Sequence, residues 1–182
     1  MNPRKSTGAR VVVRSPTPAD REGYLAAMRS SRKLHRPWLP AASDETFDRL
    51  LRCVEDDRFE PGLVCRIEDG ALAGFINVNE IVRGLFQSAF LGYAAVAGYE
   101  GQGYMREGLE LVMARAFNDL GLHRLEANIQ PGNQPSIALV RGAGFVREGF
   151  SERYLKIGGR WRDHERWAIR VEQWRDRSRD GR

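Results

Sequence analysis

The sequence is poor in the residues that build disulfides and metal sites. Cys53 and Cys65 are its two cysteines, and its three histidines, His35, His123 and His164, share no metal-ligand spacing. Two isolated thiols are typical of small buried side chains in a reducing compartment. We therefore expect a cytoplasmic protein that binds no metal ion.

Long apolar runs and the signatures of several enzyme classes are also missing. No stretch approaches the roughly 20 apolar residues of a membrane helix, and no apolar segment follows the basic N-terminus. We therefore expect neither a membrane span nor a secretory signal. The chain has no Gly-Lys-Ser/Thr loop of the nucleotide hydrolases and no G-x-S-x-G sequence of the α/β-hydrolases.

Basic side chains are in excess, with a net charge of +5 and a sequence pI of about 9.6. This charge permits a polyanionic neighbour such as the ribosome, and equally a site for a phosphorylated cofactor. The basic residues are scattered rather than interleaved with aromatic ones, so we expect no direct readout of nucleic acid.

The apolar periodicity predicts one domain over residues 1–182, with flexible tails at 1–8 and about 172–182. The order is strand, two helices, three strands, helix, strand, helix and two strands, which is typical of a mixed α/β (α+β) domain with a long antiparallel run. The expected strands lie at 10–14, 63–68, 72–82, 86–96 and 124–130, with two more within 145–169. The expected helices begin near 18 and 43, span 105–120, and end near 142–144.

The segment from Val96 to Met105, VAGYEGQGYM, lies between a predicted strand and the strongest predicted helix. Gly101 and Gly103 allow backbone conformations that other residues resist and leave room for a close ligand. Backbone N–H groups that converge at a helix N-terminus bind anions, so a pyrophosphate fits here. Two glycines separated by one residue are more often a simple turn, and it is the strand–loop–helix context that favours the phosphate site.

These residues resemble the GNAT acetyltransferases, which carry Q/R-x-x-G-x-G/A after their fourth strand. Gly98 to Gly103 matches that motif except at its first position, where Gly98 stands. Leu91-Gly92-Tyr93, Asn133-Gln134-Pro135-Ser136 and the segment 142–149 extend the similarity. Ile81 to Gly84, Arg36-Pro37-Trp38 and Gly159 to His164 resemble the ribosomal-protein-alanine N-acetyltransferases of the RimJ/RimL type. The resemblance implies a central mixed, mostly antiparallel sheet flanked by helices, with acetyl-CoA as the cofactor.

The resemblance also implies roles for residues of the cofactor site. Ala95 and Val96 would bond the pantetheine arm, and the pyrophosphate would be held by Gly101, Gln102, Gly103, Tyr104 and Met105. Asn133 and Ser136 would lie near the thiol end. Ser136 is the candidate proton donor to the thiolate, since the tyrosine that many members place four residues later is Val140 here. Alternatively, Asn133 and Ser136 form a helix N-cap without any cofactor.

The acceptor must be a neutral amine, and the resemblance indicates the N-terminal α-amine of a protein such as a ribosomal protein. A weak base is then sufficient to deprotonate the acceptor, and Glu80 and Glu152 are candidates for it. Each of them also fits an ordinary surface carboxylate. Tyr93 could face the acceptor or pack in the core, and Trp38 and Arg83 could line the peptide-binding mouth. Acetylation of a small amine (polyamine, aminoglycoside or amino acid) and a non-catalytic CoA- or nucleic-acid-binding module remain alternatives, as do a monomer and a homodimer.

Overall fold

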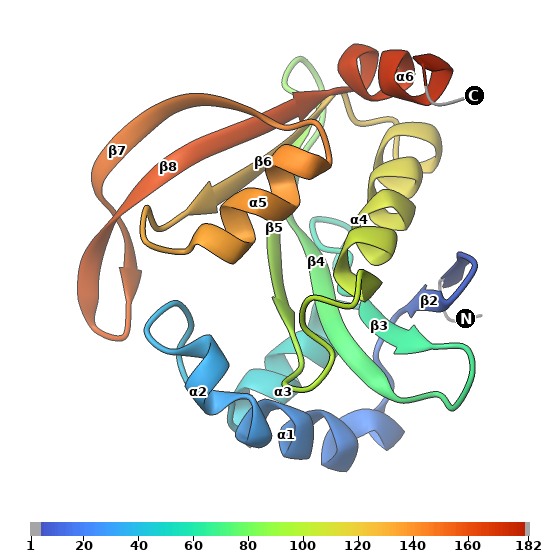
Figure 1. Cartoon of the computed structure of the whole chain (residues 1–182), viewed down its shortest axis with the longest axis vertical. Helices are drawn as coiled ribbons and strands as arrows, with labels where there is room; N and C mark the ends of the chain where they lie inside the picture. Colours follow the sequence, from blue (N-terminus) through green and yellow to red (C-terminus); the bar gives the residue numbers. More distant parts are fainter. Residues whose placement is uncertain (1–4, 181–182) are drawn as a thin grey trace.

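The computed structural model describes residues 5–180, with side chains as far as 177. Its centre is an eight-stranded sheet in the order β1-β2-β3-β4-β5-β6-β8-β7 (Figure 1). Neighbouring strands are antiparallel except β5 and β6, which run parallel. The strands are β1 Lys5–Thr7, β2 Val11–Arg14, β3 Leu63–Arg66, β4 Leu72–Val82, β5 Ser88–Ala95, β6 Arg124–Ile129, β7 Val146–Ile157 and β8 Arg160–Arg170. The expected mixed, mostly antiparallel sheet is confirmed.

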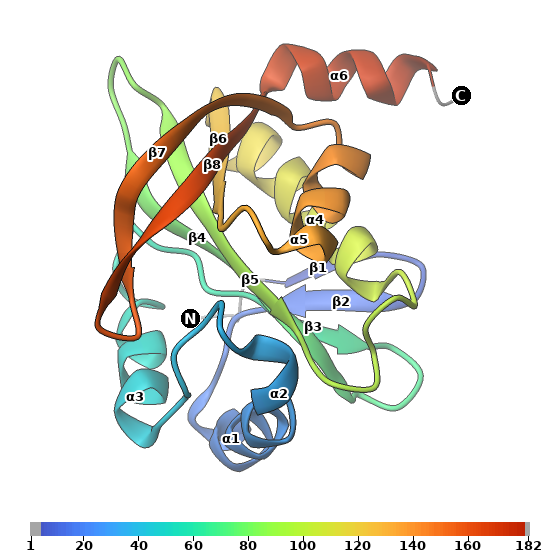
Figure 2. The same ribbon diagram turned by 60° about the vertical axis from the view of Figure 1, so that its left-hand side comes forward.

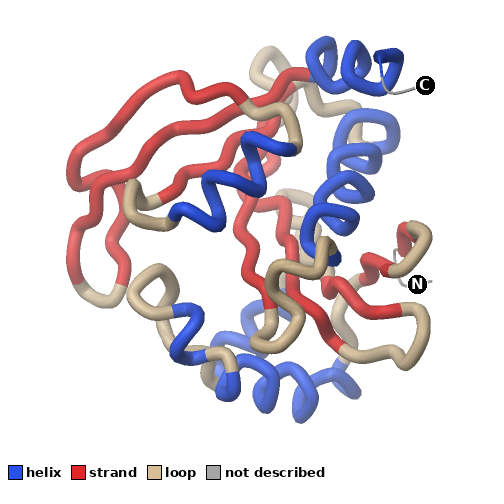
Figure 3. Tube along the Cα trace, in the orientation of Figure 1, coloured by secondary structure: helices blue, strands red, loops and turns tan. Residues whose placement is uncertain are grey.

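The helices lie on both faces of this sheet, so the predicted flanking helices are also confirmed (Figures 1 and 3). They are η1 Pro18–Asp20, α1 Arg21–Ser30, α2 Arg32–His35, α3 Asp44–Arg52, α4 Tyr104–Ala114, the π-helical turn η2 Arg115–Asp119, α5 Gln134–Gly142 and α6 Val171–Asp180. Within residues 5–180 we find no helix that is long and apolar enough to cross a membrane.

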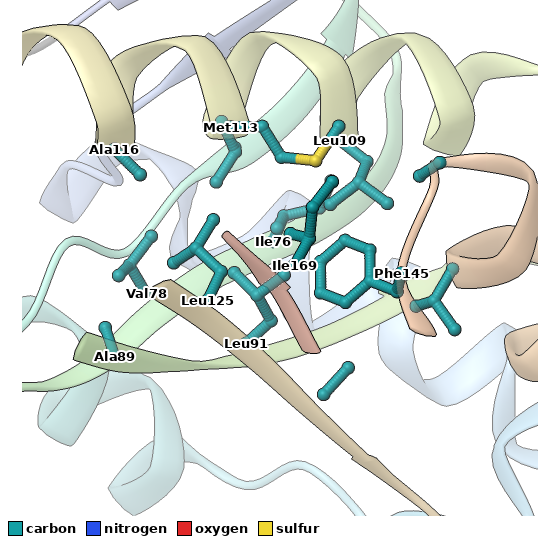
Figure 4. Close-up of a cluster of buried hydrophobic side chains, with 14 of the residues drawn as sticks. Ile76, Val78, Ala89, Leu91, Leu109, Met113, Ala116, Leu125, Phe145 and Ile169 are labelled. Carbon is teal, nitrogen blue, oxygen red and sulfur yellow. The ribbon is translucent and has the colours of Figure 1, made fainter. Parts of the chain in front are cut away.

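The main core lies between α4 and one face of the sheet. Leu109, Met113 and Ala116 point from the helix onto the strands, where Ile76, Leu91, Leu125 and Ile169 receive them (Figure 4). These side chains recur on α4 at the helical spacing that the sequence predicts and alternate along each strand. Truncating a fully buried leucine such as Leu109 removes about 2–5 kcal/mol of stability.

A smaller core lies on the opposite face, beneath α1 and α3. Tyr24 and Phe47 pack there with their ring centroids 5.2 Å apart, against Leu63 and Cys65 of β3. Val64, between these two β3 residues, faces α4 instead. The sheet is therefore covered on both faces over β3 and β4, whereas β5 and β6 contribute to the main core on the α4 side.

The expected flexible tails contain regular structure in the described residues. Residues 5–7 form β1, which pairs with β2, and the C-terminal segment forms α6. The ring of Trp174 lies 5.4 Å from that of Phe117, and Arg177 pairs with Glu110 at 2.8 Å. These contacts hold α6 although its sequence shows no apolar stripe, so residues 5–7 and the C-terminal segment carry regular secondary structure that the sequence pattern did not predict. Residues 1–4, 181 and 182 lie outside the described part of the chain.

An ion pair beside η1 makes stability depend on pH. The Asp20 carboxylate accepts hydrogen bonds from Arg14 Nη1 at 2.9 Å and from the backbone N–H of Thr17 at 2.7 Å. The hydrogen bond from Arg14 is the main cause that lowers the pKa of Asp20 from 3.8 to about 2. The folded protein therefore binds this proton more weakly than the unfolded chain does, so the stabilisation is present above pH 4 and is lost as pH falls through 2.

We expect Asp20→Asn to lower the free energy of unfolding by about 1–2 kcal/mol at pH 7 and by roughly half of that at pH 3. Urea unfolding at both pH values measures the difference. Asp44→Asn is the control, because that carboxylate is 76% exposed and its ion pair with Arg21 contributes little. A loss at pH 3 as large as that at pH 7 would contradict the titration of Asp20.

Candidate active site

The sheet opens between its two parallel strands. Three residue pairs join β5 to β6, from Ser88↔Arg124 to Phe90↔Glu126, and beyond them β5 stays paired with β4 while β6 stays paired with β8. Just after β5, the N–H of Val96 donates to Ala73 on the β4 side at 2.8 Å. Since backbone groups alternate along a strand, those of Tyr93 and Ala95 point the other way, into the gap. The splayed strand that the resemblance implies is therefore present. Of the groups along its edge, the carbonyl of Ala95 accepts from His35 Nε2 at 2.8 Å, and the remaining ones face the gap.

A cleft of about 910 Å³ passes through this gap. At one end it is lined by the loop before α4, with Tyr99, Glu100, Gly101, Gly103, Met105 and Arg106. In the middle it is lined by β5, β6 and α5, with Leu91, Gly92, Tyr93, Ala95, Asn128, Asn133 and Ser136 among them. At the other end it is lined by residues of the α2 segment, the end of β4 and the β7–β8 hairpin, among them His35, Trp38, Glu80, Tyr154, Leu155 and His164. In Figures 1 and 2 the tip of the β7–β8 hairpin lies on the same side of the molecule as α2 and the loop that follows it.

The loop before α4 has the geometry of an anion site. Gly98, Gly101 and Gly103 have φ values of 91°, 73° and 85°, and Gly103 is the N-cap of α4. A side chain at Gly101 would have no neighbouring atom within 4 Å, so the loop is open at that point. Arg106 lines the cleft beside the helix N-terminus and brings positive charge to it. Arg10 donates to the carbonyl of Gln102 at 3.2 Å and is itself paired with Glu107 at 3.0 Å. The site therefore favours a phosphorylated ligand.

Three predicted cofactor residues do not line the cleft. Val96 is buried against α1 and α3, and the side chain of Gln102 hydrogen-bonds the carbonyl of Gly98. The ring of Tyr104 lies between Arg10 and Arg66, at 5.1 and 5.6 Å. The backbones of Gln102 and Tyr104 remain within the loop, so any contact with a ligand from these two positions is a backbone contact. Both backbone groups of Val96 are bonded within the protein, its N–H to Ala73 and its carbonyl to the N–H of Tyr99.

Tyr93 and Ser136 meet in the middle of the cleft, with their hydroxyl oxygens 2.7 Å apart. Burial raises the pKa of Tyr93 to about 12, so the phenol keeps its proton at neutral pH. Asn133 is the N-cap of α5 and accepts from the N–H of Ser136 at 3.4 Å, so the capping interpretation holds as well. Val140, in place of the family's tyrosine, is fully buried in the core and cannot contact a ligand.

The predicted acceptor residues divide into two groups. Trp38 and Glu80 line the cleft. The side-chain amide of Gln130 donates to the carbonyl of Trp38 at 3.3 Å. Glu80 lies at a bulge in β4, where its φ is 50°. Arg83 and Glu152 are not brought to the cleft. The Arg83 guanidinium donates to the carbonyl of Leu120, and Glu152 is an exposed residue of β7. The bulge turns the end of β4 away, which no spacing in the sequence reveals.

Asn128 and His164 are among the cleft residues that were not sequence candidates for the site. Asn128 lies on the face of β6 opposite the core, and His164 is 3% exposed on β8. Burial lowers the pKa of His164 below its ordinary 6.5, so the imidazole is neutral at pH 7. The alternation of side chains along β8 could have indicated His164, since it places His164 on the same face of the strand as the buried Ala168. Among the described residues, no cluster of His, Cys, Asp and Glu could hold a metal ion.

Comparison with known proteins decides the family. A family model described as the acetyltransferase (GNAT) domain matches residues 10–146. The chain belongs to the GNAT acetyltransferases. It is 37% identical over 118 residues to a probable N-acetyltransferase, YjcK, of Bacillus subtilis. It is 34% identical over 107 residues to the ribosomal protein uS5-alanine N-acetyltransferase of Escherichia coli.

Solved GNAT structures agree with this assignment. The ribosomal-protein-S5-alanine acetyltransferase of Vibrio fischeri has a TM-score of 0.83 at 26% identity and covers 94% of this chain and 98% of its own. RimJ of Mycobacterium smegmatis, solved with CoA-disulfide, has a TM-score of 0.83 at 25% identity and covers 99% and 93%. The predicted N-acetyltransferase class and the resemblance to the RimJ/RimL type are confirmed.

The sequence matches to the curated GNAT relatives are partial. They cover 65% of this chain and 65% of YjcK, and 59% of this chain and 55% of the Escherichia coli enzyme. A spermidine N-acetyltransferase of Vibrio cholerae, solved with CoA and spermine, shares the fold with a TM-score of 0.79 at 20% identity. The family is established by the domain match over residues 10–146, whereas the acceptor is a separate question.

Proposed function

We propose that this enzyme transfers the acetyl group of acetyl-CoA to the N-terminal α-amine of a protein, with a ribosomal protein as the first candidate. The observation that carries the proposal is the composition of the acceptor end of the cleft. Away from the phosphate loop, Glu80 is the one carboxylate that lines it among the described residues, and aromatic and aliphatic side chains make up most of the rest. A polycationic amine is better matched by several carboxylates, whereas a peptide N-terminus brings a single charge and apolar side chains.

Three features of the cleft end beside the α4 loop support acetyl-CoA as its ligand. The open strand edge presents the backbone groups of Tyr93 and the N–H of Ala95 to an amide-bearing arm, in the manner of an added strand. The loop at Gly101 is empty where a pyrophosphate needs room, and it lies at a helix N-terminus with Arg106 beside it. When bound, acetyl-CoA supplies an activated acyl group as a thioester.

The hydroxyl pair assists departure of the thiolate by hydrogen bonding. Tyr93, with a pKa of about 12, is a weaker acid than an ordinary thiol near 8.5 by roughly 3.5 units. Full proton transfer from it would cost about 5 kcal/mol, so the pair stabilises the anion rather than neutralising it. Ser136, held by Tyr93 at 2.7 Å, is the group that donates toward the sulfur in this proposal.

The chemistry favours an α-amine over lysine. With a pKa near 7.7–8.0, about 10–20% of an α-amine is neutral at pH 7, against well under about 0.1% of a lysine side chain. The difference of roughly 2.5 units corresponds to about 3.5 kcal/mol that the enzyme need not supply. The proposal places the enzyme in the cytoplasm near newly made proteins, and it accommodates a monomer or a homodimer.

Thiol release from acetyl-CoA with a panel of acceptors tests the proposal. We expect turnover with short peptides that begin with Ala, Ser or Met, and at least about 100-fold lower kcat/KM with the same peptides N-blocked and carrying a lysine. Turnover confined to spermidine, an aminoglycoside or a free amino acid would keep the acetyltransferase and replace the substrate class. No turnover, with no acetyl-CoA binding by calorimetry, would contradict both the cofactor and the activity.

A further inference from the structure

His164 has a free nitrogen in the acceptor end of the cleft. Its Nδ1 lies 2.9 Å from the carbonyl oxygen of Arg162. A carbonyl oxygen only accepts, so Nδ1 carries the hydrogen of the neutral ring and Nε2 carries the lone pair. His35, the other histidine of the cleft, is arranged oppositely, because its Nε2 lies 2.8 Å from the carbonyl of Ala95 and must donate there. His164 is therefore the imidazole whose Nε2 can take a proton.

Asn128, a neighbour of His164 in the sheet, has a buried side-chain oxygen without a hydrogen-bond partner among the described residues. Asn128 of β6 pairs with Arg166 of β8, which makes His164 its diagonal neighbour on the same face of the sheet. The Oδ1 atom of Asn128 is buried and has no partner among the described residues, and the residue lines the cleft. A buried carbonyl without a partner costs stability, so a donor from a ligand gains by reaching it. A primary amine carries such donors.

We infer that His164 is the base that removes a proton from the acceptor amine, and that Asn128 holds that amine. This inference rests on the proposed amine acetylation. The ammonium form gives one proton to Nε2 of His164, directly or through one water. The neutral nitrogen then forms its bond to the acyl carbon as the carbon–sulfur bond breaks. The second proton lost by the nitrogen ends on the sulfur, and His164 later releases its proton to solvent.

The surroundings of His164 suit this role. On its own strand Arg162 and Arg166 share its face. Burial, the largest influence on its pKa, disfavours a charged ring, whereas the carbonyl of Arg162 and the adjacent Asp163 favour one. From β7 the ring of Tyr154 packs edge-on at 6.1 Å. From β6, Glu126 is already paired with Arg124 at 2.9 Å. The burial of the imidazole outweighs Asp163, and the ring is the neutral base at pH 7.

A conservative substitution separates this role from a structural one. In His164→Asn the side-chain amide can donate to the carbonyl of Arg162 as Nδ1 does, and the basic nitrogen is lost. With acetyl-CoA and an alanine-initiated peptide at pH 7, we expect kcat/KM to fall by about 100-fold. The Kd for acetyl-CoA and the melting temperature should stay as in the wild type. His123→Asn, at an exposed histidine paired with Glu172, is the matched control and should leave kcat/KM unchanged.

A second acceptor makes the test specific for proton removal. An aminooxyacetyl peptide ends in an –ONH₂ group that is neutral at pH 7, so the loss caused by His164→Asn should shrink to a few-fold. Asn128→Leu should raise KM for the alanine peptide about tenfold without lowering the melting temperature, because it removes a buried unpaired carbonyl. His164→Gln gives the same comparison of acceptors if His164→Asn does not fold.

The outcomes distinguish this inference from the proposed function. If the wild type acetylates no amine, both fall. If the wild type is active and His164→Asn keeps its kcat/KM within threefold, the base assignment alone is wrong. Equal losses with the two acceptors would show that His164 only supports the structure of the cleft.

Discussion

Replacing Gly101 by Asp is expected to raise the Kd for acetyl-CoA by at least about 100-fold, which corresponds to roughly 2.7 kcal/mol. The φ of 73° at this position is one that Asp tolerates better than most residues, and its Cβ would meet no atom within 4 Å. The fold should therefore survive. The new carboxylate would lie where we place the pyrophosphate, and two like charges about 4 Å apart repel by up to roughly 4 kcal/mol near a protein surface.

Two further variants isolate the effect of charge at Gly101. Gly101→Asn has the same size without the charge and should weaken binding less. Gly70 has the same φ of 73° and is equally open, in the β3–β4 turn outside the cleft. Gly70→Asp should therefore bind acetyl-CoA like the wild type in calorimetry. Unchanged binding by Gly101→Asp would remove the phosphate loop from the cofactor site.

Gly74→Ala is expected to lower the free energy of unfolding by about 3 kcal/mol, because overpacking at this point cannot relax easily. Gly74 lies on β4 opposite Ala95, and an added Cβ would come within 2.6 Å of the carbonyl oxygen of Ala94. It would also collide with the sulfur of Met105 at the start of α4. The methyl group thus pushes on the strand edge and on the loop that together form the cofactor end.

Urea unfolding measures the stability loss, and calorimetry with acetyl-CoA measures the displacement of the site. Gly23→Ala is the control, since Gly23 lies within α1, away from any atom that a Cβ would meet. There the substitution should stabilise the protein by about 0.5–1 kcal/mol. If Gly74→Ala were as stable as the wild type, the close packing of β4, β5 and α4 at this point would be contradicted.

Much of the fold could be predicted because its signals are local. The stripe from Leu109 to Phe117 predicted α4, and the Asp69-Gly70 turn predicted the β3–β4 hairpin. The glycines before α4 marked the anion site for the same reason. By contrast, β1 and α6 depend on tertiary contacts, such as that between Trp174 and Phe117, which no periodicity records.

The candidate site was predictable only where one segment forms it. Gly101, Gly103, Asn133 and Ser136, which line the cleft, could be proposed because each lies in a short motif. The contact of Tyr93 with Ser136 joins residues 43 positions apart, and His164 enters the cleft because the β7–β8 hairpin folds over it. Arg83 was misplaced since the bulge at Glu80 changes the direction of the chain. Such arrangements depend on how distant strands pair, which the pattern of one sequence does not contain.

The short parallel pairing of β5 with β6 also has a thermodynamic consequence. It divides the sheet into two half-sheets, β1 to β5 and β6 to β8, which share three register pairs and the core beneath α4. A molecule lying in the gap would form a bridge from one half-sheet to the other, so part of its binding energy would oppose their separation. The backbone amides along the open edge of β5 would then exchange their hydrogens more slowly when the cofactor is present. In the proposed complex, the cofactor would therefore also be a structural link between the two half-sheets.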